Sequence, residues 1–393
     1  MQWAKKTQKI TPISATVERK LLQNAYKKQP SNALFFNKLI NAYLHENKLG
    51  DAINLCETHL EQIGKAPHAF TALMHAYRKR FDHDNVIRIG HQAMHYSPTQ
   101  SAKLCLANAY AQQGHSELLT PLMPNDVEYS DMNNDNLRLA LQTWLIARQP
   151  QTVCRLYEAL PKVKQSDAGA TSSYIKALHL IGRTDAVAQR LDYPNAVKQV
   201  HLTALNENTP LNVMNQTLAF FLSSHSKQQF EPGGHTAKLG SQMHFESDWH
   251  PLLVALEAMI RSQVECFLTE FKPYETYKPS SLSLHLWANI LGQGGHQISH
   301  IHPDALISGV YYIKVPTSIE IEALNNTNHQ GYLLFSQTEN KPYYVRPQEG
   351  LLVLFPSYLY HQTVPLTQKE TRMCIAFDVV KQHVNHEHTH PLK

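Results

Sequence analysis

Aromatic residues recur at an almost constant spacing through the first part of this chain. The steps between them are 34, 33 and 34 residues, and the positions are Tyr43, Tyr77, Tyr110 and Trp144. Ala precedes each of the three tyrosines, and apolar residues stand three and four apart from about residue 31 to residue 222. This period is typical of repeated helix-turn-helix units, none of which can bury its apolar face alone. The first half of the chain is therefore predicted to be an array of stacked helices.

The recurring segment resembles the tetratricopeptide repeat (TPR) family over about residues 20–220, and most closely over residues 35–115. Two positions depart from the motif, because Gly90 stands where a bulky apolar residue is usual and His59 where a small one is usual. The resemblance implies an α-solenoid domain over residues 1–222, with an extended concave surface that binds a protein or peptide. The alternative interpretation is a generic helical bundle in which the aromatic spacing is coincidental.

Length and composition limit the classes of protein that this chain can represent. At 393 residues it is expected to form two or three domains. A net charge of +4 and a charged fraction of 17% do not indicate a nucleic-acid partner. The longest apolar runs, such as 351–355, have five residues, and the first ten residues lack the apolar part of a secretory signal. We expect a cytoplasmic protein with no nucleic-acid or membrane partner, and the sequence leaves its oligomeric state open.

The residue pattern changes near residue 223. Residues 223–248 are rich in Ser, His, Gln, Gly and Pro, which predicts a linker, and residues 249–271 have the pattern of an amphipathic helix. Short β-branched and aromatic runs then predict strands at 283–290, 305–315, 319–323, 332–336, 343–345, 351–355 and 372–380. Many short strands imply a β-sandwich or barrel. The chain is thus predicted to be an α+β multidomain protein, with a β-rich domain over 249–380 and a histidine-rich tail over 381–393.

Histidine is the metal ligand that this chain offers in excess. The sequence holds 24 histidines but only five cysteines, and no Cys-x-x-Cys pair. His300 and His302 would point to the same face of a strand, so both could contact one ion. His361 follows an apolar run and a turn, and it is the candidate for a third ligand. Arg372 stands eleven residues later and opens another apolar run.

Other nearby side chains are alternative ligands. His302-Pro303-Asp304 also reads as His-x-Asp, so Asp304 is an alternative carboxylate ligand. The pair of His300 and His302 is favoured, because Pro303 would break the strand alternation that a 302/304 pair needs. His285 and His296 also compete, although His296 follows two glycines in a segment expected to line an entrance.

Three motifs in this order resemble the 2-oxoglutarate and Fe(II)-dependent oxygenase superfamily, and within it a bacterial and phage-type branch, over about residues 280–380. They are His-x-His-Pro at 300–303, Ser-Gly-Val-Tyr-Tyr at 308–312, and Gly-Leu-Leu-Val-Leu-Phe-Pro-Ser at 350–357, followed by a histidine and an arginine. The resemblance implies a double-stranded β-helix of the jelly-roll or cupin-like kind. It also implies that His300, His302 and His361 hold Fe(II) and leave coordination positions open.

The same resemblance assigns a cosubstrate site. It implies that Arg372 pairs with the distal carboxylate of 2-oxoglutarate, a task that suits a planar guanidinium. Tyr312 would add a phenol hydrogen bond to that carboxylate, whereas Cys374 stands where a serine is usual and removes one hydroxyl donor. The implied cofactors are Fe(II), 2-oxoglutarate as cosubstrate and dioxygen, with ascorbate as a stimulant.

Two functions from different classes follow from these features. The first is a dioxygenase that hydroxylates a Pro, Asn, Asp, Lys or His side chain of a protein or peptide recruited by the helical repeats. The alternative is a non-catalytic TPR adaptor with a degenerate or zinc-bound cupin-like domain. Loss of the carboxylate ligand and of the serine is expected of such decay, whereas retention of Arg372 is not.

Overall fold

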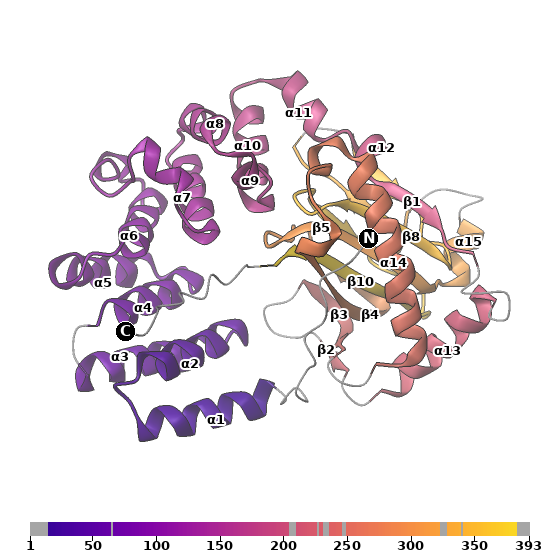
Figure 1. Ribbon diagram of the computed structural model, residues 1–393, viewed down its shortest axis with the longest axis horizontal. Helices are drawn as coiled ribbons and strands as arrows, with labels where there is room; N and C mark the ends of the chain where they lie inside the picture. The colour runs from indigo at the N-terminus through magenta and orange to yellow at the C-terminus, as the bar shows by residue number, and fades with distance from the viewer. Residues whose placement is uncertain are drawn as a thin grey trace, which may run out of the picture. The chain divides into compact units, whose positions relative to one another are not determined.

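The computed structural model describes residues 15–63, 66–203, 210–225, 228–230, 236–245, 249–322, 328–338 and 341–382. The chain forms two compact units that divide between Arg190 and Leu191. The first unit is helical, and the second contains the β-sheets (Figure 1). From residue 383 onward, the predicted histidine-rich tail lies outside the described residues.

Helices of the first unit begin at a regular interval. The earlier helices of successive pairs begin at steps of 34, 33, 34 and 34 residues, and they are α2 (Ala33–His45), α4 (Pro67–Lys79), α6 (Gln100–Gln112), α7 (Asn134–Ile146) and α10 (Ala168–Leu180). The later helices are α1 (Ala15–Lys28), α3 (Leu49–Gln62), α5 (His83–Tyr96), α8 (Pro150–Ala159) and α11 (Thr184–Arg190). After α6 the later helix is replaced by two 3-10 turns, η1 (Ser116–Leu118) and η2 (Asp126–Ser130), and the short α9 (Lys162–Gln165) precedes α10. The predicted helical first half is confirmed, and its period continues beyond Trp144.

Each earlier helix ends in the same way. The residue after its cap is left-handed, with φ of 56°, 58°, 85°, 58° and 74° at Asn47, Phe81, Gly114, Arg148 and Gly182. The next amide donates to the carbonyl of the recurring position, as Lys48 N does to Tyr43 O (2.8 Å) and Arg183 N does to Leu178 O (2.9 Å). This is the Schellman ending, which satisfies carbonyls that a helix end leaves free. The aromatic recurrence therefore marks the last turn of each earlier helix.

The hydroxyls of the recurring tyrosines bind the preceding helix. Gln23 Nε2 donates to Tyr43 Oη (2.6 Å), and Tyr77 Oη donates to Glu57 Oε1 (2.9 Å). Tyr110 Oη lies 3.0 Å from His91 Nε2. Each of these contacts joins one helical pair to the next, as a stacked array requires.

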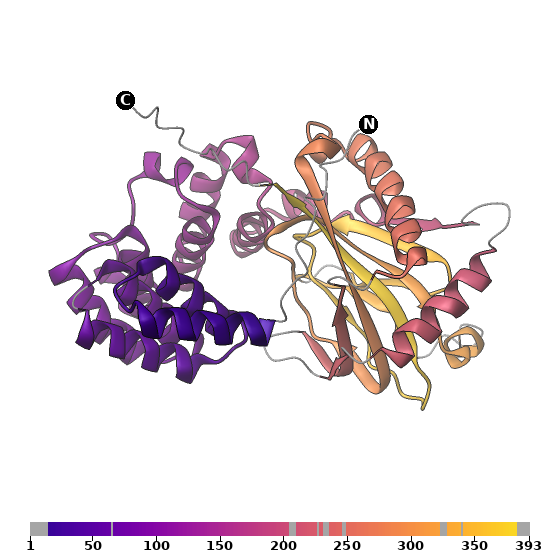
Figure 2. The ribbon, with the colours of Figure 1, turned by 60° about the horizontal axis from the view of Figure 1, so that its bottom comes forward.

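Two antiparallel sheets form the second unit, and Figure 2 shows its long strands side by side. The seven-stranded sheet has the order β1 (Lys198–His201), β8 (Leu351–Pro356), β5 (Ala305–Lys314), β10 (Arg372–Lys381), β4 (Leu282–Gln297), β3 (Ala237–His244) and β2 (Gln229–Phe230). The three-stranded sheet has the order β7 (Tyr343–Val345), β6 (Leu333–Phe335) and β9 (His361–Thr363). The rings of Phe335 and Phe355 pack 4.9 Å apart between the sheets. The arrangement is consistent with the expected β-helix domain.

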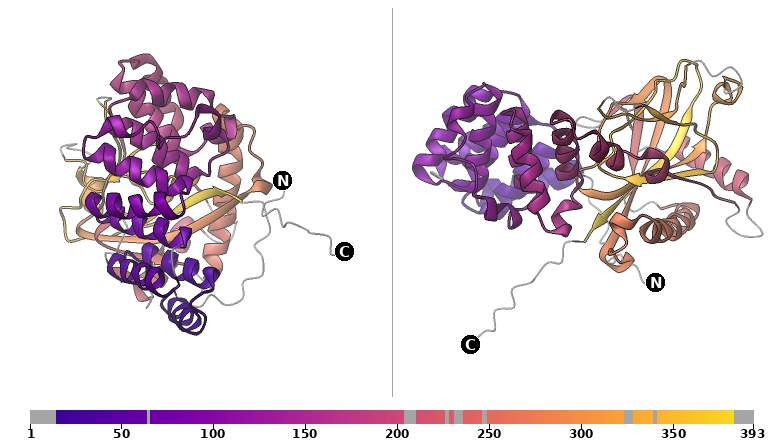
Figure 3. Two further views of the ribbon diagram at one scale, coloured as in Figure 1. Left: turned by 90° about the vertical axis from the view of Figure 1, so that its left-hand side faces the viewer. Right: turned by 90° about the horizontal axis from the view of Figure 1, so that it is seen from above.

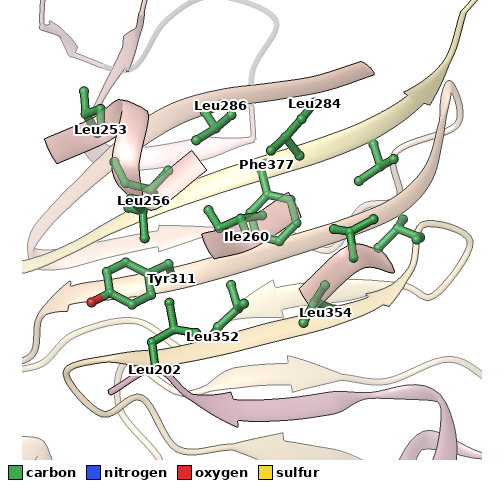
Figure 4. Close-up of a cluster of buried hydrophobic side chains, with 14 of the residues drawn as sticks. Leu202, Leu253, Leu256, Ile260, Leu284, Leu286, Tyr311, Leu352, Leu354 and Phe377 are labelled. Carbon is green, nitrogen blue, oxygen red and sulfur yellow. The ribbon is translucent and has the colours of Figure 1, made fainter. Parts of the chain in front are cut away.

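Alternation along the strands sends one set of side chains into an apolar core. That set includes Leu284, Leu286, Tyr311, Leu352, Leu354 and Phe377, which Figure 4 shows beside Leu253, Leu256 and Ile260. The last three belong to α14 (Pro251–Glu270), which lies along this face of the sheet (Figure 3). Residues in between point to the opposite face, because successive side chains of a strand alternate. The opposite face is therefore free to carry polar groups.

Gly309 shows how tightly this sheet is packed. It pairs with Phe377 of β10, and a Cβ at this position would lie 2.2 Å from the Phe377 ring and 2.5 Å from the Val353 carbonyl. The glycine in the Ser-Gly-Val-Tyr-Tyr run is therefore required by packing and not by a turn.

The boundary between the units differs from the expected one at residue 222. Strand β1 pairs with β8, and α13 (Leu211–Ser224) is tied to β5 by a 2.7 Å hydrogen bond from Tyr311 Oη to Asn215 Oδ1. The expected linker at 223–248 includes β2 and β3, and β3 pairs with β4. These strands were not predicted, because the segment is polar. It is polar because β3 lies near the edge of the sheet and exposes several of its side chains.

One predicted strand is a helix. Residues 319–323 were expected to be extended, but α15 covers Thr317–Glu322. The Glu370 carboxylate accepts hydrogen bonds from Thr317 N and Ser318 N, both at 3.2 Å. A distant carboxylate thus caps the start of this helix, which the local β-branched pattern cannot reveal. Among the described helices, none combines the length and hydropathy that crossing a bilayer would require.

Candidate active site

Three histidines gather where the smaller sheet meets the larger one. His361 opens β9, while His300 and His302 lie in the segment between β4 and β5 and not on a regular strand. The ring centroids are 4.3 Å apart for His300 and His361, 5.0 Å for His300 and His302, and 5.1 Å for His302 and His361. One nitrogen from each ring lies within 4.8 Å of the others. This spacing suits three ligands of a single metal ion.

Hydrogen bonds orient all three rings in the same sense. His300 Nδ1 lies 2.6 Å from Ile298 O, and His361 Nδ1 lies 3.0 Å from Leu359 O. His302 Nδ1 lies 2.9 Å from Asp378 Oδ2. A carbonyl or carboxylate oxygen only accepts, so each Nδ1 donates and each Nε2 keeps its lone pair. This is the tautomer that a metal site needs, fixed by outer partners.

Burial keeps the imidazoles of His300 and His361 neutral. It lowers the pKa of His300 to about 4, helped by the adjacent His302. Burial lowers the pKa of His361 well below its ordinary range, and the two neighbouring imidazoles act in the same direction. Neutral imidazole is the form that binds a metal, so His300 and His361 need lose no proton to do so at neutral pH.

The alternative ligands lie apart from this cluster. Among the described residues, the cluster contains His300 and not Asp304. His285 is an exposed residue of β4, and His296 Nδ1 bonds to Gly294 O at 2.9 Å. The geometry therefore favours the His300 and His302 pair over a 302/304 pair.

A pocket extends from the cluster along the free face of the sheet. Its lining includes Trp287, Asn289, His302, Phe355, His361 and Arg372. Arg372 is buried, and its Cζ lies 4.8 Å from the centroid of the Tyr312 ring. Arg372 Nε and Tyr312 Oη are both buried without a hydrogen-bond partner.

These two orphaned groups fit a carboxylate ligand. A buried guanidinium remains charged, and burying it without a partner is unfavourable. Burial raises the pKa of Tyr312, so the phenol keeps its proton and can donate. An anion placed here would satisfy both donors.

Several residues of the site were missed from the sequence. Asp378 binds His302, and Asn289 pairs with Cys374 across the β4–β10 ladder, with its Oδ1 buried and unpartnered. Burial raises the pKa of Cys374, so its thiol stays protonated. Strand alternation from Arg372 through 374 and 376 leads to position 378, and this signal could have identified Asp378.

The residues present fit an iron centre. Three imidazoles form a ligand set that suits Fe(II), and a pocket lies beside them. A buried cation at Arg372 adds a place for a carboxylate-bearing cosubstrate. The described site thus offers a place for a metal ion beside a buried cation that could bind an anion.

The model of the family described as "Putative 2OG-Fe(II) oxygenase" matches residues 285–378. The match covers about a quarter of the chain, and the oxygenases that this model describes use Fe(II), 2-oxoglutarate and dioxygen. The matched residues extend from β4 to Asp378 and include all three histidines, Tyr312 and Arg372. No curated protein matches the chain in sequence.

Two prolyl hydroxylases are among the solved structures that are similar to part of this chain. A prolyl-4-hydroxylase from Pseudomonas putida shares 14% identity over 50% of this chain and 98% of its own, with a TM-score of 0.37. A prolyl hydroxylase from Trichoplax adhaerens, solved with a peptide fragment of a hypoxia inducible factor, shares 13% identity over 60% of this chain and 93% of its own, with a TM-score of 0.37. HygX from Streptomyces hygroscopicus, solved with nickel and 2-oxoglutarate, shares 10% identity over 49% of this chain and 86% of its own, with a TM-score of 0.34. Similarity at this level does not bear on the substrate of this chain.

Proposed function

We propose that this protein is a 2-oxoglutarate- and Fe(II)-dependent dioxygenase that hydroxylates a side chain of a protein or peptide. The observation that carries the proposal is the combination of three oriented imidazoles with a buried arginine whose Nε lacks a hydrogen-bond partner, all in one pocket. A scaffold stabilised only by zinc has no need for Arg372 Nε and Tyr312 Oη to stay unpaired in the interior. The adaptor function is therefore not favoured.

In this proposal, Nε2 of His300, His302 and His361 holds the metal. When bound, Fe(II) and 2-oxoglutarate supply the oxidation, in which dioxygen is used to hydroxylate a C–H bond and succinate and carbon dioxide are released. The protein supplies orientation. Hydrogen bonds to Ile298 O, Leu359 O and Asp378 fix the three rings before any ligand arrives.

Arg372 and Tyr312 hold the far end of the cosubstrate. The guanidinium provides a fixed charge and a planar pair of donors, and the protonated phenol of Tyr312 provides a third donor. The rings of Trp287 and Phe355 line the same pocket and limit the access of water. Low access of water strengthens the charge pairing that selects a dicarboxylate.

The helical unit is proposed to be a TPR-like solenoid that recruits the substrate. The repeated helix starts and the repeated left-handed turn residues support this assignment. Stacked helix pairs make extended surfaces suited to a protein or peptide. The proposed target residue is Pro, Asn, Asp, Lys or His, and the proposed location is the cytoplasm.

A direct test uses the purified full chain with Fe(II), ascorbate and 2-oxoglutarate. Succinate release without a substrate, together with saturable binding of 2-oxoglutarate, would support the enzyme. A peptide library followed by mass spectrometry would then identify targets that gain one oxygen atom. Absence of both succinate release and 2-oxoglutarate binding would refute the proposal and favour the adaptor.

A further inference from the structure

Among the described residues, Asp378 is the carboxylate that bonds to one of the three histidines. It lies on β10, six residues after Arg372, and its Oδ2 accepts from His302 Nδ1 at 2.9 Å. The two other rings donate to backbone carbonyls. His302 is therefore distinguished from its neighbours by a charged partner.

Asp378 is itself held in place. Ser308 Oγ donates to Asp378 Oδ1 at 2.7 Å and lies 2.8 Å from Ser357 Oγ. The carbonyl of Ser357 in turn accepts from the backbone amide of His302 at 3.2 Å. The carboxylate thus has one oxygen for the imidazole and one for the serine, and both of its oxygens are fixed.

The arrangement affects the total charge that the ligand set and its partners bring to the metal. A set of three neutral imidazoles brings no negative charge to a divalent ion, whereas a set with one carboxylate ligand would bring one. Asp304, the nearby acid that could have provided such a ligand, lies outside the cluster. Asp378 places a carboxylate one hydrogen bond from the metal position instead. A carboxylate partner makes an imidazole a stronger ligand and fixes its orientation.

We propose that Asp378 is a positioning residue that orients His302 and supplies, through its ring, the negative charge that the three-histidine set lacks. This inference rests on the proposed metal site, but it concerns a different residue and a different measurement. Ser308 acts on Asp378 by holding its second oxygen. The metal affinity of this chain then depends on a side chain that does not itself bind the metal.

The test measures Co(II) binding to the full chain, with the visible spectrum of Co(II) as a report of its ligands. Asp378→Asn removes the charge and keeps the size of the side chain, and its Co(II) affinity is expected to fall about 10- to 100-fold. Asp304→Asn is the matched control and is expected to leave Co(II) affinity unchanged. Ser308→Ala is expected to weaken Co(II) binding in the same direction, but less than Asp378→Asn.

A second readout separates this role from general damage to the fold. The Co(II)-loaded Asp378→Asn protein is expected to bind 2-oxoglutarate no more weakly than the parent, because Arg372 is intact and the site has become more positive. Weaker binding of both ligands would indicate a structural role and would overturn the proposal. Equal Co(II) affinity of Asp378→Asn and parent would overturn it as well, while leaving the proposed enzyme function intact. A parent protein that binds no divalent metal would refute both.

Discussion

His300 and His361 exchange two backbone hydrogen bonds, with N-to-O distances of 3.1 Å and 3.0 Å. The bridge joins the segment before β5 to the first residue of β9. Two of the three candidate metal ligands are therefore held together by main chain, independently of their side chains. Removing one ring should leave the bridge in place.

His361→Ala is accordingly expected to abolish binding of Fe(II) or Co(II) while the fold persists. The His361 side chain is buried, so a loss of about 1–3 kcal/mol in stability is expected from the vacated space. Metal titration and thermal unfolding measured by circular dichroism check the two parts separately. Parental metal affinity in this variant would show that His361 is not a ligand.

Arg372→Ala is expected to weaken 2-oxoglutarate binding far more than metal binding. Removing one partner of a buried charged pair typically costs about 2–5 kcal/mol, which is roughly 30- to several-thousand-fold in affinity. Arg372→Lys should restore only part of the affinity, because an ammonium cannot reproduce the planar pair of donors. Calorimetric titration of the metal-loaded variants with 2-oxoglutarate measures both effects. An unchanged dissociation constant in Arg372→Ala would remove this residue from the cosubstrate site.

A chain that begins at Leu191 is expected to fold, bind metal and release succinate without a substrate, because every strand of the sheets lies beyond that point. It should lose efficiency toward its protein target, since the helical unit is proposed to supply affinity. A chain that begins at 225 would lack β1 and α13, together with the core residues Met214, Leu218 and Leu222. That shorter chain is expected to aggregate. If the 191–393 chain and the full chain hydroxylate the target with equal efficiency, the helical unit does not recruit the target.

The helical unit should lose stability in mild acid. Burial lowers the pKa of His75 to about 4, and the positive charges of Arg78 and Lys79 act in the same direction. In the unfolded chain the pKa is about 6.5, so the unfolded state binds the extra proton first as the pH falls. Stability is full above about pH 6.5 and falls by about 3 kcal/mol as the pH approaches about 4. Denaturant unfolding across this range checks the slope, and His75→Gln should make it shallower.

Burial lowers the pKa values of His59 and His68 in the same unit, so these residues contribute in the same direction. A slope that is identical in parent and His75→Gln would show that His75 does not carry this effect.

Phe81→Gly is expected to stabilise the helical unit. Phe81 has φ of 58° and is 79% exposed, so the substitution relieves a left-handed conformation and removes few contacts. Left-handed geometry costs a residue with a Cβ roughly 1–2 kcal/mol, part of which is offset by the flexibility of glycine in the unfolded chain. The equivalent Gly114 has φ of 85° and open space around it, so Gly114→Ala should destabilise for the same reason. Urea unfolding of the two variants tests the pair, and a less stable Phe81→Gly would contradict the argument.

Much of this architecture could be predicted from local pattern. The spacing of Tyr43, Tyr77 and Tyr110 predicted the helical half, because the residue that ends a helix is specified within a few positions of its own turn. The β-branched and aromatic runs in 305–315 and 372–380 predicted strands for the same reason, and these strands pair in the structure. Local pattern failed at 319–323, where Glu370 caps a helix from a distant part of the chain.

The residue types of the site were also visible in the sequence. His300, His302, His361 and Arg372 stand out as a set, because they occur in one order with the motifs that resemble the oxygenase superfamily. Their spacing could not decide between His300 and Asp304, and it did not indicate Asp378. His300 is brought to His361 because the loop between β4 and β5 pairs with β9. Asp378 is brought to the site because β10 lies beside β5.

The sequence by itself determined the helical period, most of the longer strands and the residue types available at the site, because each depends on residues close together in the chain. Only the tertiary structure decided where the second unit begins, which histidines meet and which carboxylate supports them. These features depend on strand order and register, which bring together segments as distant as 198–201 with 351–354 and His302 with Asp378. The physical reason is that such pairings are selected by the burial of the whole sheet and not by any short stretch of sequence.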